Sequence, residues 1–484
     1  MKISKRKRMI LSAIGALAAA GLILVGCQAG PNGNPGVSGF SKGVITAKGS
    51  IFVNGVEFDT AGAAITVDDQ AGAPDADLKV GMVVSVKGTI DSATGRGTAT
   101  EVQYAKNLEG TVDVGSIDAA AGTFKVFGQT IQTDPTTVFE GVADLASLAA
   151  GDRVEVSGVA DAIAQVLLAS RVEKKAASLE DFDIKGTIKA GSSAPGTFAL
   201  TSPAFAADLT VNYTGVLAAG IVDGAFVEVK FSTFSSSTST ITTSADKVSL
   251  EDELRAADGE RTEVSGVVSD LATGATTTTF TVDGVDVSAD NSRVAGIVNG
   301  VQVEVKGTMN GTVLVAEVVK AERESTVELE GNITASSVDV TAKTLTLNGV
   351  VLLIDSRTIF RDDSSTPLSG FGIADLATTA HIEVSAYPDS SVSPAVAVAT
   401  KVERQDPDTK AFIKSPVGAK ATNQLTMLGV TVDTGSASFM DPNGVAYADQ
   451  PAFLAAIVLG TTVVKVKGSS SGASFAATEA QVED

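Results

Sequence analysis

The sequence predicts an all-β protein built from about six small β-barrels in tandem, preceded by an N-terminal targeting segment. Three observations predict this organisation: a low-charge composition rich in β-forming residues, a strand motif that recurs along the chain, and a basic and apolar start that ends at the single cysteine. The chain has 484 residues, of which 48 are Gly, none is Trp and 19% are charged. At roughly 100 to 200 residues per domain, this length excludes one compact domain.

The N-terminus is typical of an exported protein. Residues 2–8 (KISKRKR) are basic, and residues 9–26 (MILSAIGALAAAGLILVG) are apolar and end on small residues before Cys27. Residues 24–27 (LVGC) resemble the bacterial lipobox, in which the cysteine receives a lipid and becomes the new N-terminus. The resemblance predicts a lipoprotein signal peptide over 1–27 and lipidation of Cys27. A transmembrane anchor and a cleaved secretory peptide are the alternatives.

The residues after the cysteine predict location and a tether. In cells with two membranes, the sorting rule for lipoproteins implies the outer membrane, because Gln28 rather than Asp follows the cysteine. The Gly- and Pro-containing segment 28–42 predicts a flexible tether between lipid and folded body. We therefore expect a lipid-anchored protein of the cell envelope. Both the periplasmic and the surface-exposed side of the outer membrane remain alternatives for its location.

One strand motif recurs through the rest of the chain. A small residue, usually Gly, is followed after two intervening residues by apolar residues at alternate positions, which is the period of a β-strand. The copies are GMVVSVKG (81–88), GDRVEVSG (151–158), GAFVEVKF (224–231), GVQVEVKG (300–307), TAHIEVSA (379–386) and GTTVVKVKG (460–468). The first four starting positions are spaced by 70 to 76 residues, so each repeat has the size of a small domain.

Tight hairpins precede most of these motifs. Asn-Gly and Asp-Gly between alternating apolar residues are strong hairpin signals. The hairpins are FVNGVEF (52–58), FTVDGVDV (280–287), LTLNGVVL (345–352), LTMLGVTV (425–432) and the looser FKVFGQTI (124–131). With an opening and a closing strand, each repeat has about five strands, which predicts an OB-like barrel; an open β-sandwich is the alternative. Segments before the Gly-led strand of the second, fifth and sixth copies predict short helices.

The repeats divide the chain into six units. Residues 134–161 resemble the bacterial domain of unknown function 5666, with Asp134, Thr137 and Phe139 before the Gly-led strand. The same spacing returns at Asp355, Thr358 and Phe360. The resemblance implies a β-barrel repeat lipoprotein and assigns no catalytic residue. The predicted units are β repeat 1 (43–106), repeat 2 (107–176), repeat 3 (184–256), repeat 4 (262–325), repeat 5 (326–407) and repeat 6 (408–484).

Two further segments have sequence patterns that predict their local structure. In 249–260 (SLEDELRAADGE), Ser249 stands three residues before Asp252 as in a capping box, and Gly259 is a helix stop signal. This pattern predicts a helical connector. The segment 232–245 (STFSSSTSTITTSA) predicts a Ser/Thr-rich hairpin tip, with disorder or glycosylation as alternatives.

Composition narrows the function classes. One Cys and one His disfavour internal disulfides, Cys/His zinc sites and most His-dependent catalysis. The formal charge of −21 opposes binding to nucleic acid, and five of the basic residues lie within the predicted signal peptide. No Gly-Lys dipeptide is present, so a nucleotide P-loop is excluded. Paired-carboxylate glycosidase chemistry is disfavoured because the chain has no Trp and 4 Tyr to form sugar platforms.

The remaining motifs have structural explanations. The segment 468–472 (GSSSG) matches Gly-x-Ser-x-Gly but predicts a hairpin, since a hydrolase elbow needs a strand-to-helix turn and a His base. His381 alternates with Ile382 in a strand and predicts a surface or edge position. Three acidic segments could offer oxygen ligands to Ca²⁺, but we expect solvated loops and turns. They are Asp68, Asp69, Asp75 and Asp77; Arg361, Asp362 and Asp363; and Asp441, Pro442, Asn443 and Gly444.

The sequence therefore predicts a non-enzymatic, lipid-anchored envelope protein with no cofactor, no metal and no catalytic residue. Its barrels, strung as beads or a rod, would serve as a structural spacer or a protein-interaction scaffold. The alternative is an envelope binding module for a saccharide, a cell-surface polymer or a divalent cation. The expected partner is the membrane through Cys27, with an unidentified envelope protein or saccharide possible.

Overall fold

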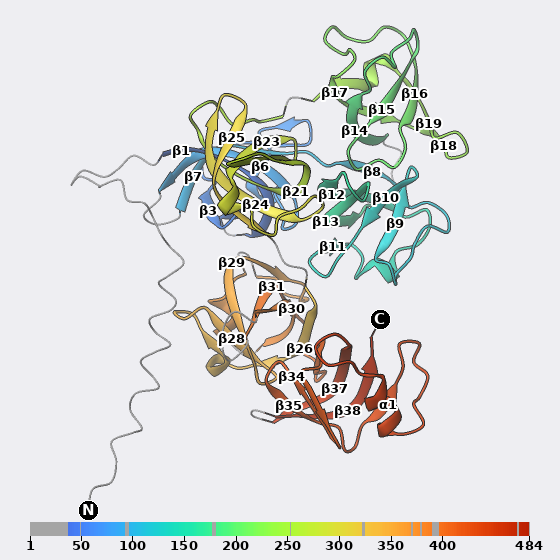
Figure 1. Ribbon diagram of the computed structural model, residues 1–484. Helices are drawn as coiled ribbons and strands as arrows, with labels where there is room; N and C mark the ends of the chain where they lie inside the picture. The colour runs from blue at the N-terminus through green and yellow to red at the C-terminus, as the bar shows by residue number, and fades with distance from the viewer. Residues whose placement is uncertain are drawn as a thin grey trace, which may run out of the picture. The chain divides into compact units, whose positions relative to one another are not determined.

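The predicted all-β architecture is confirmed. The computed structural model describes residues 37–48, 50–91, 96–176, 181–251, 253–321, 325–368, 371–377, 380–389, 396–471 and 474–483. Over these residues the chain forms strands β1–β38 and a single α-helix, α1 (Gln450–Ala456), arranged in three sheets of 12, 13 and 13 strands (Figure 1). Within the described part of the chain, no helix is long and apolar enough to cross a membrane.

The first repeat shows the topology that the others follow. Its strands are β1 (Val37–Ala47), β2 (Ile51–Val53), β3 (Val56–Asp59), β4 (Ala64–Val67), β5 (Gln70–Ala71), β6 (Val83–Asp91) and β7 (Arg96–Tyr104). β1 pairs antiparallel with both β2 and β6, and β3 runs parallel to β7, so the order β1–β2–β3–β7–β6 closes on β1. A closed five-stranded ring with one parallel pair fits the predicted OB-like barrel, because closure removes exposed strand edges.

Repeats 2 and 3 follow the same order. Repeat 2 contains β8 (Leu108–Thr111), β9 (Thr123–Val126), β10 (Gln129–Gln132), β11 (Val138–Glu140), β12 (Arg153–Asp161) and β13 (Val166–Lys174). Repeat 3 contains β14 (Phe182–Ile188), β15 (Thr197–Thr201), β16 (Leu209–Thr214), β17 (Phe226–Phe231), β18 (Thr233–Ser235), β19 (Thr240–Ser244) and β20 (Val248–Leu250). β18 and β19 pair antiparallel, which confirms the predicted Ser/Thr-rich hairpin.

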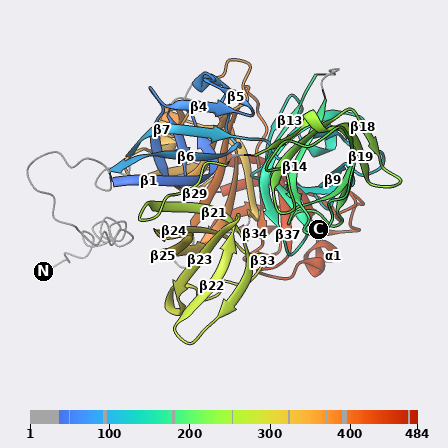
Figure 2. The same ribbon diagram turned by 90° about the horizontal axis from the view of Figure 1, so that it is seen from above.

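Repeat 4 forms a closed barrel and repeat 5 a more open one. Repeat 4 contains β21 (Arg261–Thr273), β22 (Thr277–Val282), β23 (Val285–Asp290), β24 (Gln302–Asn310) and β25 (Val313–Ala321). Figure 2 shows its long β22–β23 hairpin. Repeat 5 contains β26 (Val327–Ile333), β27 (Val338–Asp339), β28 (Thr344–Leu347), β29 (Val350–Asp362), β30 (Ala380–Asp389) and β31 (Val396–Gln405).

Repeat 6 carries the α-helix. It contains β32 (Phe412–Pro416), β33 (Ala419–Ala421), β34 (Gln424–Met427), β35 (Val430–Asp433), β36 (Ser438–Met440), β37 (Val463–Ser471) and β38 (Ser474–Val482). The helices predicted before the Gly-led strands are present in short form. Single 3-10 turns occupy Leu145–Ser147 and Asp375–Ala377, and α1 is capped by the Asp449 carboxylate, which accepts from Ala452 N at 2.9 Å.

All five predicted hairpins are formed by two-residue turns in which both residues have positive φ. Asn54-Gly55 has φ of 50° and 78°, and Asp283-Gly284 has 45° and 77°. The left-handed conformation favours Asn, Asp and Gly. The looser FKVFGQTI segment makes the same turn, although Phe127 has to adopt a φ of 54°.

The repeats are joined through their first strands. β8 pairs antiparallel with β14, β26 pairs antiparallel with β32, and β1 pairs in parallel with β21. Repeats 2 and 3 therefore share one sheet and one apolar core, as do repeats 5 and 6, whereas repeats 1 and 4 share a sheet but keep separate cores. The described residues all belong to one compact unit.

The pairing of β1 with β21 joins two repeats that are not consecutive in the chain. A string of separate beads would place only consecutive repeats in contact, whereas β1 and β21 belong to the first and fourth repeats. Gly39 pairs with Arg261 and Lys42 with Val264 along this parallel ladder. Backbone hydrogen bonds thus connect repeats that are more than 200 residues apart in the sequence.

Two predictions of local structure are wrong. β1 begins at Val37, so the last six residues of the predicted tether 28–42 are strand. All six pair with β6, and Gly39–Lys42 also pair with β21. The helical connector over 249–260 is also not formed by the described residues. Ser249 and Leu250 pair with β17, and the Leu254 N–H donates to Gln103 Oε1 at 2.6 Å. Tertiary hydrogen bonds replace the helix here.

Candidate functional site

The predicted lipidation site Cys27 lies outside the described residues. The acidic residues predicted as a solvated loop form ion pairs. Asp68 contacts Lys106 Nζ at 3.4 Å, and Asp75 contacts Lys48 Nζ at 2.9 Å. Asp69 reaches Lys230 Nζ, in repeat 3, at 2.5 Å. These lysines already neutralise the carboxylates, which argues against calcium at this loop.

The second acidic segment is also ion-paired. Asp362 ends β29 and contacts Arg404 NH2 at 2.6 Å, and Arg361 contacts Asp363 at 2.6 Å. The prediction of a solvated loop is wrong for Arg361 and Asp362, because β29 extends to Asp362 and pairs in parallel with β31. The Asp441 turn is confirmed: its carboxylate accepts from Val445 N at 2.8 Å.

His381 is buried, so its predicted surface position is wrong. The side chain does point away from Ile382, as the alternation predicted, and Ile382 lies in the core. His381 is nevertheless only 2% exposed, because Glu330 and Asn332 on the neighbouring strand β26 cover it. Its Nε2 lies 2.9 Å from Glu330 Oε1, and its Nδ1 lies 3.2 Å from Asn332 Oδ1.

The GSSSG segment runs along the hairpin end of β37, where Ser470 pairs with Phe475 and Ser471 with Ser474. Gly472 lies outside the described residues. The segment therefore lies at the end of a hairpin between two paired strands, as predicted. A hydrolase elbow would instead need a strand-to-helix turn.

The two family-like Thr residues have the same structural role. Thr137 Oγ1 donates to the Ala169 carbonyl at 2.7 Å, and Thr358 Oγ1 donates to the Ala399 carbonyl at 2.8 Å. Both acceptors lie in the fifth strand of their barrels. The repeated spacing thus fixes the segment after the third strand against the fifth strand, which is a packing role.

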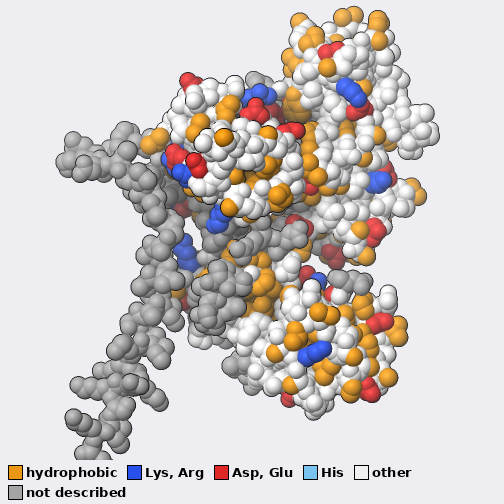
Figure 3. All heavy atoms as spheres, in the orientation of Figure 1, with side chains coloured by type: hydrophobic (Ala, Val, Ile, Leu, Met, Phe, Trp, Pro, Cys, Tyr) orange, Lys and Arg blue, Asp and Glu red, His pale blue; other side chains and the backbone are white. Residues whose placement is uncertain are grey.

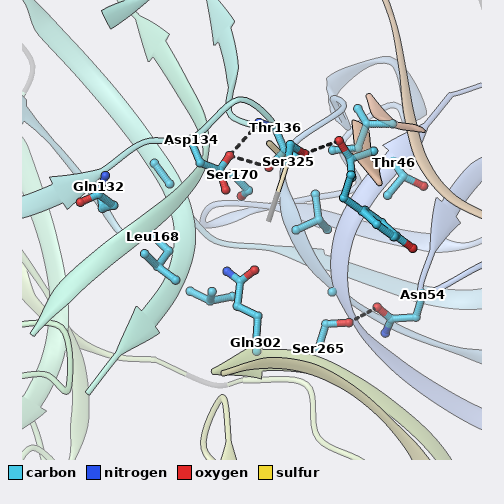
Figure 4. A pocket seen from close by; sticks show the side chains of 18 of the residues that line it. Thr46, Asn54, Gln132, Asp134, Thr136, Leu168, Ser170, Ser265, Gln302 and Ser325 are labelled. Carbon is cyan, nitrogen blue, oxygen red and sulfur yellow. Dashed lines mark hydrogen bonds between the residues drawn. The ribbon is translucent and has the colours of Figure 1, made fainter. Parts of the chain in front are cut away.

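A cavity of about 200 Å³ lies where residues of repeats 1, 2, 4 and 5 meet (Figure 4). β1 and the Asn54 turn line it from repeat 1, β13 from repeat 2, β21 and Gln302 from repeat 4, and β31 and Tyr387 from repeat 5. Sequence reasoning missed this site, since no single repeat contains it.

Polar groups around the cavity are held in place by hydrogen bonds. Ser265 Oγ donates to Asn54 Oδ1 at 2.6 Å, and the Asn54 amide donates to the Lys42 carbonyl at 3.0 Å. Ser170 Oγ donates to the Gly81 carbonyl at 2.6 Å. These hydroxyl protons are used within the protein, so the oxygens keep lone pairs that can accept hydrogen bonds from a ligand.

The Gln302 side chain differs from these groups. Its carboxamide extends into the middle of the cavity in Figure 4, and none of the hydrogen bonds described for the chain involves it. It can therefore donate and accept at once. Leu168 and Val398 supply apolar walls, and the described lining includes no Lys, Arg or His. Asp134 is the charged residue of this lining, so the cavity disfavours an anion and suits a small, hydroxyl-rich ligand that is neutral or positively charged.

Charged residues cover the junction of repeats 2 and 3. Arg153 Nε donates to Glu109 Oε1 at 2.5 Å, and Lys106 Nζ lies 3.0 Å from Asp183. Burial raises the pKa of Asp183 to about 7 despite the nearby Lys106. Burial also raises the pKa of Glu109, but Arg153 and Lys106 outweigh it and hold that pKa below its usual range. The junction is therefore a network of ion pairs, and the cavity lined by Asn107, Lys185 and Phe205 beside it has a volume of only about 30 Å³.

Comparison with known proteins gives one family. A family model described as Domain of unknown function (DUF5666) matches residues 42–103, 109–173 and 330–403, which are the first, second and fifth barrels. No curated protein matches the chain. The three matches lie on separate barrels with a common strand order, and their shared Thr residues make equivalent hydrogen bonds. The chain therefore contains three DUF5666 repeats, in its first, second and fifth barrels.

Proposed function

We propose that this protein is a non-enzymatic, lipid-anchored scaffold or spacer of the cell envelope. The observation that carries the proposal is the continuity of the sheets across repeats. Backbone ladders join repeat 1 to 4, 2 to 3 and 5 to 6, and such ladders resist bending more than flexible linkers do. Joined barrels of this kind suit a body that holds surfaces at fixed separations.

Surface charge also supports an interaction role. Basic and acidic side chains lie beside each other on the face shown in Figure 3, with apolar side chains scattered between them. Exposed lysines also form ion pairs with neighbouring carboxylates, as in Lys189–Asp208 and Lys467–Glu479. A mixed surface with a net charge of −21 favours solubility and disfavours nucleic acid as a partner.

The membrane partner in this proposal is reached through Cys27, and the location is the outer membrane. Support comes from the lipobox-like residues 24–27 and from Gln28 after the cysteine. Two acyl signals make anchoring stable, because each buried methylene contributes about 0.8 kcal/mol. Whether the barrels face the periplasm or the exterior does not alter the scaffold role.

Labelling with radioactive palmitate in a bacterial host tests the anchor. We expect the full chain to take up label and to fractionate with the outer membrane. Cys27→Ala is expected to lose the label, because no other cysteine exists in the chain. Gln28→Asp is a matched control that should keep the label and shift the protein to the inner membrane. Equal labelling of wild type and Cys27→Ala would disprove lipidation.

A second candidate function is suggested by the cavity shared by four repeats. Its hydroxyl acceptors, the Gln302 carboxamide and the absence of described cationic side chains favour a neutral saccharide unit. Its volume of about 200 Å³ lies below the roughly 300 to 1,000 Å³ of drug-sized ligand sites, so we expect one sugar ring to enter.

A glycan array followed by calorimetry tests this second function. We expect Gln302→Ala to weaken binding of any sugar found on the array at least tenfold, since it removes both a donor and an acceptor inside the cavity. Gln424→Ala changes an exposed glutamine on β34 and should leave the affinity unchanged. Equal binding by the two variants would place the sugar outside the cavity. If no glycan on the array binds, the saccharide function is rejected and the scaffold proposal is unaffected.

A further inference from the structure

The junction of repeats 5 and 6 repeats that of repeats 2 and 3 in the same register. Leu108 pairs with Ile184 in one junction, and Leu329 pairs with Ile413 in the other. The next pairs outward, Glu109 with Asp183 and Glu330 with Phe412, also correspond. Each residue of one junction therefore has an identifiable counterpart in the other.

This register makes His381 the counterpart of Arg153. On the fourth strand of each barrel, Glu155 lies opposite Glu109 and Glu383 lies opposite Glu330. Arg153 and His381 each stand two residues earlier on that strand. A permanently charged guanidinium in one junction is thus replaced by an imidazole in the other, beside an equivalent glutamate.

Arg153 connects two repeats. Its Nε donates to Glu109 Oε1 at 2.5 Å on β8, and its NH2 donates to the Asp181 carbonyl at 2.7 Å in the segment before β14. The corresponding segment before β32 contains Asp408. The side-chain oxygens of Glu330 and Asp408 and a ring nitrogen of His381 all lie within 4.8 Å of one another.

The hydrogen bonds around His381 determine which ring nitrogen carries a proton. The Asn332 Nδ2 donates to the Asp408 carbonyl at 2.8 Å, and a carbonyl can only accept, so the Asn332 orientation is fixed. Asn332 Oδ1 must then accept from His381 Nδ1, which lies 3.2 Å away. In the neutral ring, Nε2 consequently presents a lone pair.

That lone pair faces another acceptor. His381 Nε2 lies 2.9 Å from Glu330 Oε1, in a pocket where His381 is 2% and Glu330 9% exposed. Two acceptors at this distance repel each other unless a proton, on the ring or on the Glu330 carboxyl group, or a metal ion lies between them. At the junction of repeats 2 and 3, the Arg153 guanidinium supplies the positive charge beside the equivalent carboxylate, that of Glu109.

We propose that Glu330, His381 and Asp408 bind a divalent transition-metal ion of the Zn²⁺ class and thereby join repeats 5 and 6. One imidazole nitrogen and two carboxylates are ligands that Zn²⁺ accepts. Two ligands held tetrahedrally at about 2.0 to 2.2 Å from one ion lie roughly 3.3 to 3.6 Å apart, so the 2.9 Å between His381 Nε2 and Glu330 Oε1 has to widen by a few tenths of an ångström when the ion binds. The Nδ1–H bond to Asn332 orients the ring as outer partners of metal-bound histidines do.

The surrounding charges are compatible with the ion. Lys410 Nζ pairs with Asp408 at 2.9 Å, but its side chain is 71% exposed and can turn into water. Glu383 lies on the same strand as His381, and burial raises its pKa above the usual range. Lys414 is engaged with Glu328 at 3.0 Å. No described cation other than Lys410 thus competes for the ion's position. The inference does not depend on the scaffold role or on the lipid anchor.

Zinc calorimetry on the full chain in detergent, without a histidine tag, tests the proposal. We expect wild type to bind Zn²⁺ through a site that His381→Arg lacks, with at least tenfold weaker binding in Glu330→Gln. His381→Arg is chosen because arginine stands at the equivalent position, 153, in the junction of repeats 2 and 3, so this variant should keep the fold. Glu251→Gln alters the other carboxylate cluster, which Lys185 already neutralises at 2.9 Å, and should leave zinc binding unchanged.

Nuclear magnetic resonance provides a second readout, because the chain has 1 His. Labelling with ¹⁵N-histidine gives one pair of ring resonances, and we expect the Nε2 signal to move on addition of Zn²⁺ while Nδ1 stays protonated. Equal zinc uptake by wild type and His381→Arg, or an unchanged Nε2 signal at saturating zinc, would overturn the proposal and leave a doubly protonated ring as the cation.

Discussion

Replacing Gly158 by valine is expected to lower the free energy of unfolding of repeats 2 and 3 by about 3 kcal/mol or more. Gly158 lies at a β-bulge where β12 shifts register against β13. A Cβ built at this position would stand 2.1 Å from the Leu168 carbonyl oxygen and 2.9 Å from its carbon. Backbone atoms have no alternative rotamer, so the strands would have to separate and lose ladder hydrogen bonds.

The same close approach recurs, which makes the effect general. Gly88, Gly307 and Gly468 also lie at bulges, where a Cβ would stand 2.0 to 2.1 Å from a carbonyl oxygen of the fifth strand. In repeat 5 Ala386 occupies this place, so that barrel has room for a methyl group. Repeat 3 has Phe231 at the corresponding position of its motif, so the restriction applies to the four copies that have glycine there.

Urea unfolding followed by circular dichroism measures the loss. Gly372→Ala is the matched control, because its added Cβ meets nothing within 4 Å and should change stability by less than about 0.5 kcal/mol. A Gly158→Val protein that unfolds at the wild-type urea concentration would show that the bulge can open at little cost, contrary to the geometry.

Replacing Phe127 by alanine is expected to cost about 3 to 5 kcal/mol. Phe127 is 2% exposed, and its ring centroid lies 5.0 Å from that of Phe231 and 5.3 Å from that of Phe234, both in repeat 3. Phe182 lies 5.8 Å away. Removing the ring leaves a cavity at the core shared by the two barrels.

The contribution of Phe127 to the hairpin turn can be separated from the contribution of its ring to packing. Phe127 has a φ of 54°, and Asn54 and Asn348 occupy the same turn position with φ of 50°. Phe127→Asn therefore keeps a favourable turn residue and removes only the aromatic contacts. We expect both variants to be destabilised, with Phe127→Asn less so than Phe127→Ala, and both to show faster proteolysis between repeats 2 and 3. Wild-type stability of Phe127→Asn would show that the ring contributes only to the turn.

The local pattern predicted much of the fold. Alternating valines placed the fourth strand of each barrel, and Asn-Gly or Asp-Gly placed the hairpins, because these features depend on residues a few positions apart. Even the weaker FKVFGQTI segment was identified as a hairpin. What the pattern could not reveal is that Phe127 takes the left-handed position because three rings of the next repeat contact it.

The candidate sites were less predictable. The side of the strand on which His381 lies followed from alternation, but its burial depends on Glu330 and Asn332, about 50 residues earlier in the chain. The cavity combines Asn54 with Ser265, which are 211 positions apart. The connector over 249–260 carried a capping pattern, and its described residues, 249–251 and 253–260, still form no helix, because pairing with β17 gave Ser249 and Leu250 other backbone partners.

By itself, the sequence determined the all-β class, about six repeats of about five strands each, and the lipobox-like start that predicts an anchor at Cys27. All of these depend on short periodicities and on turn residues with restricted φ. Only the tertiary structure decided which first strands pair, where four repeats enclose a cavity, and that His381 faces a carboxylate. Strand edges and buried polar groups pair with residues that are from about 50 to more than 200 positions away in the chain. Such contacts produce no periodic pattern in the local sequence, so the sequence alone does not predict them.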